Sequence, residues 1–448
     1  MVFSSAVFLF LFLPVVVLLH TVIKNNNVRN GMLIAASLIF YAYGEPVCIV
    51  LLVGSVFVNL IFGNILTRNK NKAILALAVG LNLLLLIFYK YTGLVRMPIG
   101  ISFFTFQAIS YVVDVYRSEE KENVGFFDVL LYISLFPQLI AGPIVKFNSI
   151  KNQIKDRVVT LDGLTSGIRR FVTGLSKKML IANTMAYVAD TVFALATDSI
   201  GSGIAWFGAV CYTLQIFFDF SGYSDMALGL GSMMGFTFPE NFDHPYIATS
   251  VRGFWRRWHM SLTAWFRDYL YIPLGGNRKG TARKLLNTMI VFACTGIWHG
   301  ANWTFLIWGI FHGIFMCVEE LLSKGKKEER FNILKWACTM LVVIVGFVIF
   351  RSDNIGYAVA YIGKMFSFTS AGGAGLLLSM LTPVFIVTFI FALVACTPVV
   401  AFVSDRIKGK RIYNILNVIS YAITFVLLFL CILGLAADSY NPFIYFRF

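Results

Sequence analysis

Histidine side chains are the first candidates for chemistry in this sequence. Three of the five, His259, His299 and His312, lie between residues 254 and 313, in a chain that is otherwise mostly hydrophobic. Imidazole is the side chain best suited to exchange protons near neutral pH. This concentration of histidine predicts a catalytic region, which we place at residues 205–315.

His299 lies in an apolar run, directly after Trp298 and three residues before Asn302. Apolar surroundings favour the neutral imidazole over the charged form. A neutral imidazole beside a polar cavity can take a proton from a hydroxyl group, which is the task of a general base in acyl transfer. A histidine hydrogen-bonded between two helices would give the same pattern, so spacing alone leaves both interpretations open.

His259 belongs to a stretch, residues 252–271, whose pattern predicts one amphipathic helix in the cytoplasmic interface of a membrane. Its apolar face would contain Trp255, Trp258, His259, Leu262, Trp265, Phe266 and Tyr269, and its polar face Arg256, Arg257, Arg267 and Asp268. The arginines would either anchor the helix to lipid headgroups or receive the phosphates of a donor. His259 would bind the donor or orient other groups, or be part of a tryptophan-rich anchor. His312 is interpreted as structural.

Composition defines the class of protein that holds these residues. Of 448 residues, 58% are hydrophobic and 13% are charged, whereas a soluble domain is about 25% charged. The formal charge of +15 resides largely in short loops between apolar runs, as the positive-inside rule requires, so nucleic acid is not implied. The seven cysteines lack metal-ligand spacing and are expected to fill the core, and we expect no metal and no bound cofactor.

The apolar runs predict about eleven transmembrane helices in a single polytopic domain, residues 1–448. A span needs about 20 mostly apolar residues. Basic loops after the first and third spans place the N-terminus outside, and the tail SYNPFIYFRF (439–448) should also end outside. The expected spans are near 4–23, 31–44, 46–66, 73–91, 204–220, 285–301, 303–322, 331–350, 376–396 and 413–435, with one more between residues 100 and 145.

Three segments depart from plain spans. FPQLIAGP (136–143), which contains Gln138, is either a re-entrant dip lining a cavity or a kinked span. Residues 160–197 predict one or two helices on the inner surface. Asp219 and Asp225 are either paired or line a cavity, because a carboxylate is costly in apolar surroundings, or they cap helices after a break at Gly222.

Two long runs, FWRRWHMSLTAWFRDYLYIPLGGNRKG and GIWHGANWTFLIWGIFHG, resemble the membrane-bound O-acyltransferase family, in particular its bacterial alginate O-acetylation branch. The likeness extends through GISFFTFQAISYVVDVYR, LFPQLIAGPIVKF, LQIFFDFSGYSDMALGLG and FPENFDHPY to the C-terminal tail, which is nearly the whole chain. The resemblance implies that His299, in the WHG motif, is catalytic and that His259, in the RRWH motif, is the second functional position. It also implies a fold of spans around a central tunnel.

The resemblance further implies that an acyl thioester donor, such as acetyl-CoA or an acyl carrier, delivers an acetyl group from the cytoplasm through the bacterial cytoplasmic membrane. His299 would act as base or as transient acyl acceptor, and His259 would support the donor side. Asn302, Asp219, Asp225, Gln138 and Trp298 are expected as tunnel lining. The acceptor would be an alginate-like or other envelope polysaccharide, reached through a separate extracytoplasmic transferase of the SGNH type.

Two alternatives remain at this stage. Within the enzyme class, the chain could serve peptidoglycan O-acetylation or D-alanylation of teichoic acid. From another class, it could be a transporter or flippase, since intramembrane histidines and broken helices also mark those proteins. No repeated pair of broken helices is visible in the two halves of the sequence, which favours the enzyme.

Overall fold

The structure is a computed structural model that describes residues 1–120, 124–323, 331–368 and 374–437. Within these ranges the regular structure is helical and contains no strand, which confirms the predicted all-α class. The chain divides into two compact units, each described by itself below. Unit 1 comprises residues 1–175 and 223–240, and unit 2 comprises 176–222 and the described part of 241–448. The prediction of a single domain stays a prediction.

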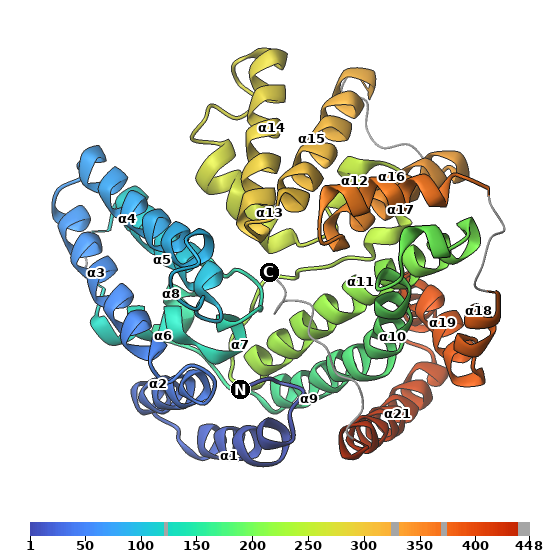
Figure 1. Cartoon of the computed structure of the whole chain (residues 1–448). Helices are drawn as coiled ribbons and strands as arrows, with labels where there is room; N and C mark the ends of the chain where they lie inside the picture. The colour runs from blue at the N-terminus through green and yellow to red at the C-terminus, as the bar shows by residue number, and fades with distance from the viewer. Residues whose placement is uncertain (121–123, 324–330, 369–373, 438–448) are drawn as a thin grey trace. The chain divides into compact units, whose positions relative to one another are not determined.

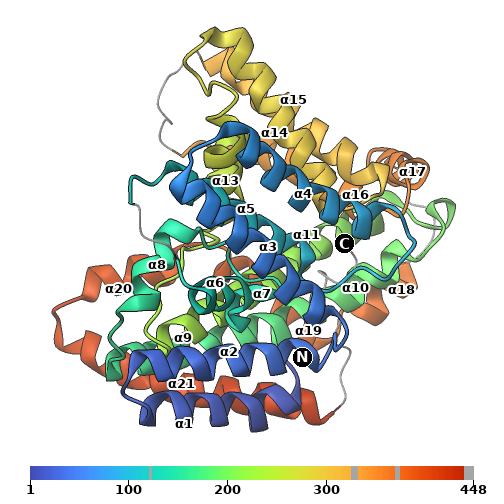
Figure 2. The same cartoon turned by 90° about the vertical axis from the view of Figure 1, so that its left-hand side faces the viewer.

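Unit 1 is built from the N-terminal helices. Helices α3 and α4 pack along α5, and α1 packs along α2 (Figures 1 and 2). The helices are a π-helical turn (Phe8–Phe12), α1 (Leu13–Val22), α2 (Asn26–Ala42), α3 (Cys48–Arg68), α4 (Lys72–Tyr91), α5 (Ile101–Arg117), α6 (Phe126–Ser134), α7 (Phe136–Leu139), α8 (Phe147–Lys155) and α9 (Leu161–Ser176).

Unit 2 contains most of the catalytic region predicted from sequence, residues 205–315, of which residues 223–240 belong to unit 1. Its longest helix, α11, is 32 residues long and runs on from unit 2 into unit 1. The helices are a π-helical turn (Lys177–Ala182), α10 (Asn183–Phe193), α11 (Ser202–Met233), α12 (Val251–Trp255), α13 (Met260–Phe266), a second π-helical turn (Arg267–Tyr271), α14 (Gly280–His299), α15 (Trp303–Ser323), α16 (Ile333–Arg351), α17 (Ile355–Met365), α18 (Ala374–Met380), α19 (Pro383–Ala395), α20 (Val399–Ile407) and α21 (Arg411–Ala436).

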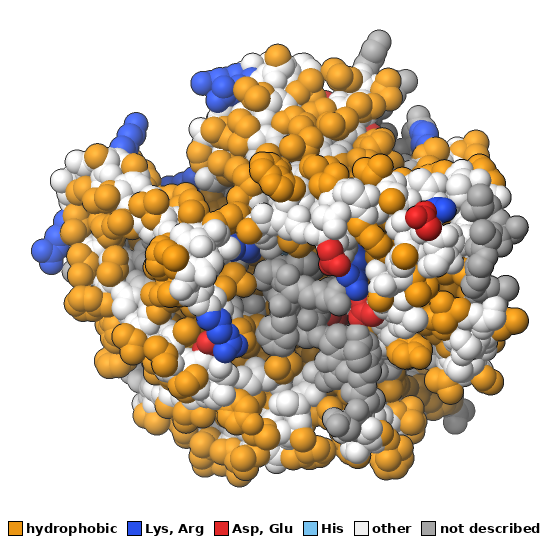
Figure 3. Space-filling view, viewed as in Figure 1, with side chains coloured by type: hydrophobic (Ala, Val, Ile, Leu, Met, Phe, Trp, Pro, Cys, Tyr) orange, Lys and Arg blue, Asp and Glu red, His pale blue; other side chains and the backbone are white. Residues whose placement is uncertain are grey.

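Six helices of the described residues are long and apolar enough to cross a membrane, and a seventh crossing results if the bent pair α19–α20 counts as one. Large hydrophobic side chains are exposed on five of them, α3, α4, α15, α16 and α21. Figure 3 shows hydrophobic side chains over α3 and α4 and over α14 and α15. The chain is therefore a multi-pass membrane protein, while the count of eleven spans stays a prediction. The predicted outside location of the tail concerns residues 439–448, which lie outside the described residues.

The FPQLIAGP segment is not a plain kinked span. Helix α6 has nine residues, so it is about 13 Å long, less than half of the roughly 30 Å hydrocarbon core. A break at Leu135 follows, and then the four-residue helix α7, which contains Gln138. All of residues 135–145 are buried inside unit 1.

Helix α11 corrects the prediction of a break at Gly222. It continues without interruption from Ser202 to Met233, so Asp219 and Asp225 lie inside the helix and cap nothing. Both are paired instead: Lys178 Nζ lies 2.7 Å from Asp219 Oδ1 in unit 2, and Arg170 lies 2.9 Å from Asp225 in unit 1. Lys178 is itself buried, on the π-helical turn of the segment expected at the inner surface.

The stretch 252–271 corrects the prediction of one continuous amphipathic helix facing lipid. His259 adopts a left-handed backbone conformation (φ 43°) and separates α12 from α13. The rotation of about 100° per residue on which the predicted face depended is lost there. Trp255, Trp258 and Trp265 are consequently buried in unit 2 rather than exposed to lipid.

The Lys178–Asp219 pair tests how unit 2 tolerates buried charge. Lys178→Met would leave the Asp219 carboxylate buried without its cation, at a cost of about 3–5 kcal/mol. We expect a clear fall in the thermal unfolding temperature of the detergent-solubilised protein, and recovery of most of it in the double variant Lys178→Met/Asp219→Leu. A double variant as unstable as the single one would contradict this explanation.

Candidate active site

The α14–α15 hairpin positions the catalytic candidate His299. Its two helices run side by side in both views (Figures 1 and 2). They approach so closely that a Cβ on Gly309 would lie 2.3 Å from Phe292 O, and one on Gly296 would lie 2.4 Å from Phe305 O. Only glycine fits such a backbone contact, which explains why the motif is rich in this residue.

His299 is the last residue of α14 and is half-buried. Its ring lies edge-on to Trp308, with centroids 5.2 Å apart, and to Phe350, with centroids 5.1 Å apart. These aromatic side chains come from α15 and α16. The imidazole is therefore held by rigid neighbours while part of it stays accessible.

His259 is almost completely buried, with 1% of its surface exposed. Its Nδ1 lies 3.0 Å from Asn241 Oδ1, and its Nε2 has no hydrogen-bond partner among the described residues. The ring packs edge-to-face on Phe220, with centroids 4.6 Å apart. Burial lowers the pKa of His259 from its ordinary value of 6.5 to about 3, so the ring is neutral at physiological pH.

Trp298 brings the two motif histidines together. Its ring centroid lies 6.1 Å from that of His259 and 4.8 Å from that of His299. The RRWH and WHG motifs thus form one site in unit 2, although they are 40 residues apart in sequence.

A cavity of about 380 Å³ lies along one face of α14. Its lining contains the cations Arg252, Arg256, Arg267 and Lys284 together with Glu320, and the rest is largely apolar. The other lining residues are Trp255, Leu262, Thr263, Phe266, Tyr271, Thr288, Val291, Phe292, Thr295 and Met316. Thr295 is one helical turn before His299. The cavity therefore follows α14 from a charged region toward the catalytic candidate.

Two glutamates at the end of α15 hold the basic part of this cavity together. Glu320 pairs with Lys284 on α14 (2.6 Å) and with Arg252 on α12. Glu319 accepts the backbone N–H groups of Val251 and Arg252, the first residues of α12. The C-terminal end of α15 thereby joins α14, which ends at His299 of the WHG motif, to α12, which directly precedes the RRWH motif.

The remaining predicted residues occupy varied positions. Asn302 caps the start of α15 through Thr304 N (3.1 Å) and donates to Asp353 O (2.6 Å). Arg257 pairs with Asp243 (2.7 Å) and does not line the cavity, and Arg267 pairs with Asp268 (2.8 Å). His312, predicted to be structural, is buried on α15 with its ring near those of Trp255 and Trp308.

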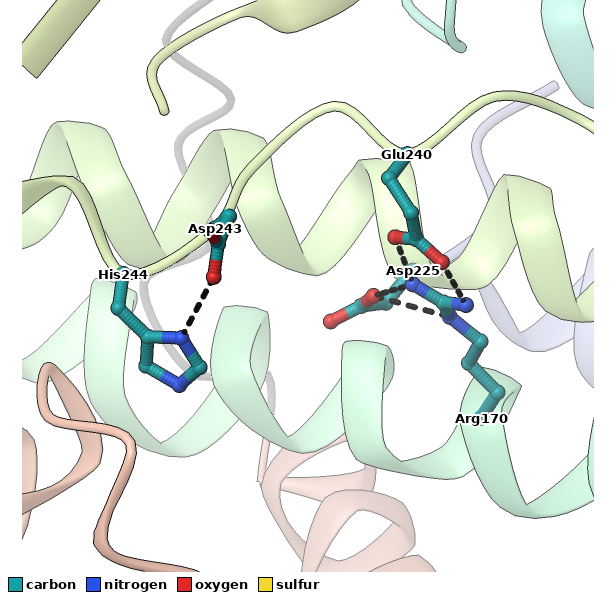
Figure 4. Close-up of polar contacts among 5 residues, drawn as sticks. All are labelled: Arg170, Asp225, Glu240, Asp243 and His244. Atoms are coloured by element: carbon teal, nitrogen blue, oxygen red, sulfur yellow. Dashed lines mark hydrogen bonds and ion pairs between the residues drawn. The ribbon is translucent and has the colours of Figure 1, made fainter. Parts of the chain in front are cut away.

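Two of the predicted lining residues belong to unit 1. Asp225 is held by Arg170, which also pairs with Glu240 (Figure 4). Gln138 donates to Tyr132 O (2.5 Å) within the buried α6–α7 segment. Figure 4 also shows an exposed contact in unit 2 between Asp243 and His244. His244 is a histidine without a local sequence signal.

Sequence reasoning missed Asn241, Trp308, Glu319 and Glu320. A signal was present for the two glutamates, since adjacent carboxylates at the end of a predicted span, residues 303–322, are unusual enough to suggest partners. Asn241 lies in the run FPENFDHPY and Trp308 in GIWHGANWTFLIWGIFHG, so their place in runs that carry the family resemblance was the signal that could have found them.

The chain is similar to one family model and to several known proteins. The family model of the membrane-bound O-acyltransferases matches residues 78–359. The probable alginate O-acetylase of Pseudomonas putida is 40% identical over 489 aligned positions that cover 100% of both chains. The peptidoglycan O-acetyltransferase of Helicobacter pylori is 36% identical, over 82% of this chain and 80% of its own. The teichoic acid D-alanyltransferase of Bacillus subtilis is 28% identical over 56% of this chain and 65% of its own.

The glycine contacts between α14 and α15 give a stability prediction. Gly309→Val would force the two backbones apart, at a cost of about 1–3 kcal/mol or more, and displace His299. We expect a lower unfolding temperature and loss of activity. The matched control is Gly363→Ala on α17, where an added Cβ has no neighbour within 4 Å and should leave the unfolding temperature unchanged or slightly higher. Equal effects of both substitutions would contradict the close-contact explanation.

Proposed function

The chain belongs to the membrane-bound O-acyltransferase family, and from this premise we propose that it passes an acetyl group from a cytoplasmic thioester across the membrane for O-acetylation of an extracytoplasmic polysaccharide. That it is an acyltransferase follows from the family and from relatives that are O-acetylases over their full length. Family membership also decides against the transporter alternative. We propose in addition that the transferred group is acetyl, that the donor is a cytoplasmic thioester, that the route crosses the membrane and that the acceptor is a polysaccharide.

The course of the cavity along α14 is the main support for this proposal. Lys284 and His299 stand on the same face of α14, about 22 Å apart along the helix axis (15 residues at about 1.5 Å each). The cavity follows this face from the basic region as far as Thr295. This geometry supports a long donor whose charged end stays among the cations while its reactive end reaches His299.

The basic end suits a donor that carries phosphate groups. Arginine and lysine hold phosphates through charge-assisted hydrogen bonds. We propose that Arg256 and Arg267 contact the donor phosphates, as expected from the sequence, and that Arg252 and Lys284 do so as well. Arg257 does not line the cavity, so we assign it to fixing the chain at Asp243 instead. The apolar remainder suits an uncharged thioester arm.

His299 would act on the hydroxyl group of the acceptor. It takes the hydroxyl proton while the oxygen attacks the thioester carbonyl, the carbon–sulfur bond breaks, and the proton passes to the leaving thiolate. An ester and a thiol result, so atoms and charges balance. The same imidazole could instead accept the acetyl group and pass it on, in which case the hydroxyl attacks an acyl-histidine.

The membrane arrangement extends the proposal to unit 1. The short helices α6 and α7, with the buried turn that follows them, fit a re-entrant segment and not a crossing. Irregular backbone at membrane depth is tolerated where protein or an aqueous cavity covers it. We therefore propose that this segment, with Gln138, forms part of a tunnel wall. We further propose the bacterial cytoplasmic membrane as the location, with both termini outside.

A separate partner would complete the pathway. The chain contains no Gly-Asp-Ser nucleophile motif. We propose that an extracytoplasmic transferase of the SGNH type receives the acetyl group and selects the polysaccharide. Alginate-like polymers are favoured by the relatives that match over their full length, and the peptidoglycan O-acetyltransferase supports the second candidate acceptor. The D-alanyltransferases match only about half of this chain.

The first test is His299→Ala in the native host. Loss of a general base typically reduces the rate about 10²–10⁴-fold. Alkali-labile acetate on envelope and secreted polysaccharide should fall to background while the protein remains in the membrane at its normal level. The polymer that loses its ester identifies the acceptor. Unchanged acetate, together with an unchanged D-alanyl ester content, would refute the proposed role of His299.

The second test concerns the donor cavity. Arg256→Ala removes one cation from the basic end, and the loss of a charged hydrogen bond of about 1.5 kcal/mol should raise the KM for acetyl-CoA roughly tenfold with little change in kcat. Thiol release by the purified protein measures both. Lys364→Ala is the control, since Lys364 pairs with Asp198 on another part of unit 2. An equal rise in KM for the two variants would contradict this assignment.

A further inference from the structure

Asn241 is a buried residue whose side chain contacts the turn that carries His259. Its Oδ1 lies within hydrogen-bond distance of three groups: His259 Nδ1 (3.0 Å), Ser261 Oγ (2.9 Å) and Ser261 N (3.3 Å). Its backbone oxygen accepts from Met260 N (2.9 Å). The asparagine thus binds every residue of the turn that carries His259.

These contacts define the protonation of the His259 ring. The backbone N–H of Ser261 can only donate, so the asparagine atom that it contacts must be the oxygen. Facing that oxygen, His259 Nδ1 must carry the hydrogen. A neutral imidazole has one hydrogen, so the lone pair is on Nε2.

The surroundings of His259 keep its ring neutral, with the hydrogen on Nδ1. The hydrogen-bond and ring partners of His259 are Asn241, Phe220 and Trp298, none of which carries a charge. Burial keeps the ring neutral far below pH 6.5. His259 Nε2 is buried and has no partner among the described residues, and an unpaired buried acceptor is costly unless something binds it. The left-handed backbone of His259 is a second cost, of about 1–2 kcal/mol.

The lone pair on His259 Nε2 determines which groups can form a hydrogen bond with this atom. It cannot form a hydrogen bond with the oxygen of a thioester carbonyl, which also offers only lone pairs, and it binds a group that donates hydrogen, such as an alcohol. We infer that Asn241 is a positioning residue that keeps His259 Nε2 as an acceptor for the hydroxyl group of the acetyl acceptor. This inference rests on the proposed function, and it moves His259 from the donor side to the acceptor side of the site.

The matched variant is His259→Asn. Asparagine tolerates the left-handed conformation and retains a side-chain N–H at the place of Nδ1, but it has no counterpart of Nε2. In purified protein with acetyl-CoA and glycerol as the alcohol, we expect the KM for glycerol to rise about tenfold or more and the KM for acetyl-CoA to stay constant. A folded His259→Asn protein with unchanged kinetics, or with a raised KM for acetyl-CoA alone, would overturn the inference.

A spectroscopic readout tests the positioning role without activity. In protein labelled with ¹⁵N in its histidine rings, the signal that disappears in His259→Asn should show protonated Nδ1 and bare Nε2 from pH 8 to pH 5. Asn241→Leu should shift this signal toward the other tautomer, and Asn241→Asp, which keeps an oxygen there, should preserve it. A protonated Nε2 in the wild-type protein, or an unmoved signal in Asn241→Leu, would overturn the inference.

His299→Ala separates this inference from the proposed function. If His299→Ala loses thiol release from acetyl-CoA while His259→Asn keeps its KM for glycerol, the inference fails and the proposed function stands. If His299→Ala and His259→Asn both retain full activity, the proposed function itself fails.

Discussion

At Gly296 and Gly309 the backbones of α14 and α15 approach until no side chain fits between them. This contact brings Trp308 against His299 and places Glu319 and Glu320 beside the start of α12. The cavity, the two motif histidines and the tryptophan between them all depend on it. Backbone contact through small residues is a common way to pack helices in a membrane, where apolar burial gives little drive for association.

Ion pairs are a second kind of contact inside the protein. Buried Lys178 is paired with Asp219, and half-buried Arg351 is paired with Asp190. The histidines of the site are treated differently, since His259 is kept neutral by burial and by an uncharged hydrogen-bond partner. A neutral ring with a free lone pair can bind a hydroxyl group, whereas an ion-paired ring would have lost that capacity. In these two ion pairs charge is neutralised by an opposite charge, whereas the ring of His259 stays uncharged.

Much of this could be predicted from local sequence. Long apolar runs located the helices that became α3, α4, α15, α16 and α21, and motif likeness selected His259 and His299 from five histidines. The break at His259 could not be predicted, because every residue of 252–271 fits a helix locally. The left-handed turn there is held by Asn241, 18 positions earlier in the chain. The cations that pair with Asp219 and Asp225 inside α11 likewise come from remote positions in the chain.

We propose that an acetyl group passes through the protein from one side of the membrane to the other. The most direct measurement uses the full chain in sealed vesicles, with labelled acetyl-CoA confined to the face that carries the basic cavity and an alcohol acceptor confined to the opposite face. We expect labelled ester on the opposite face, and none with His299→Ala. Ester formed only when donor and acceptor share one face would contradict this proposal.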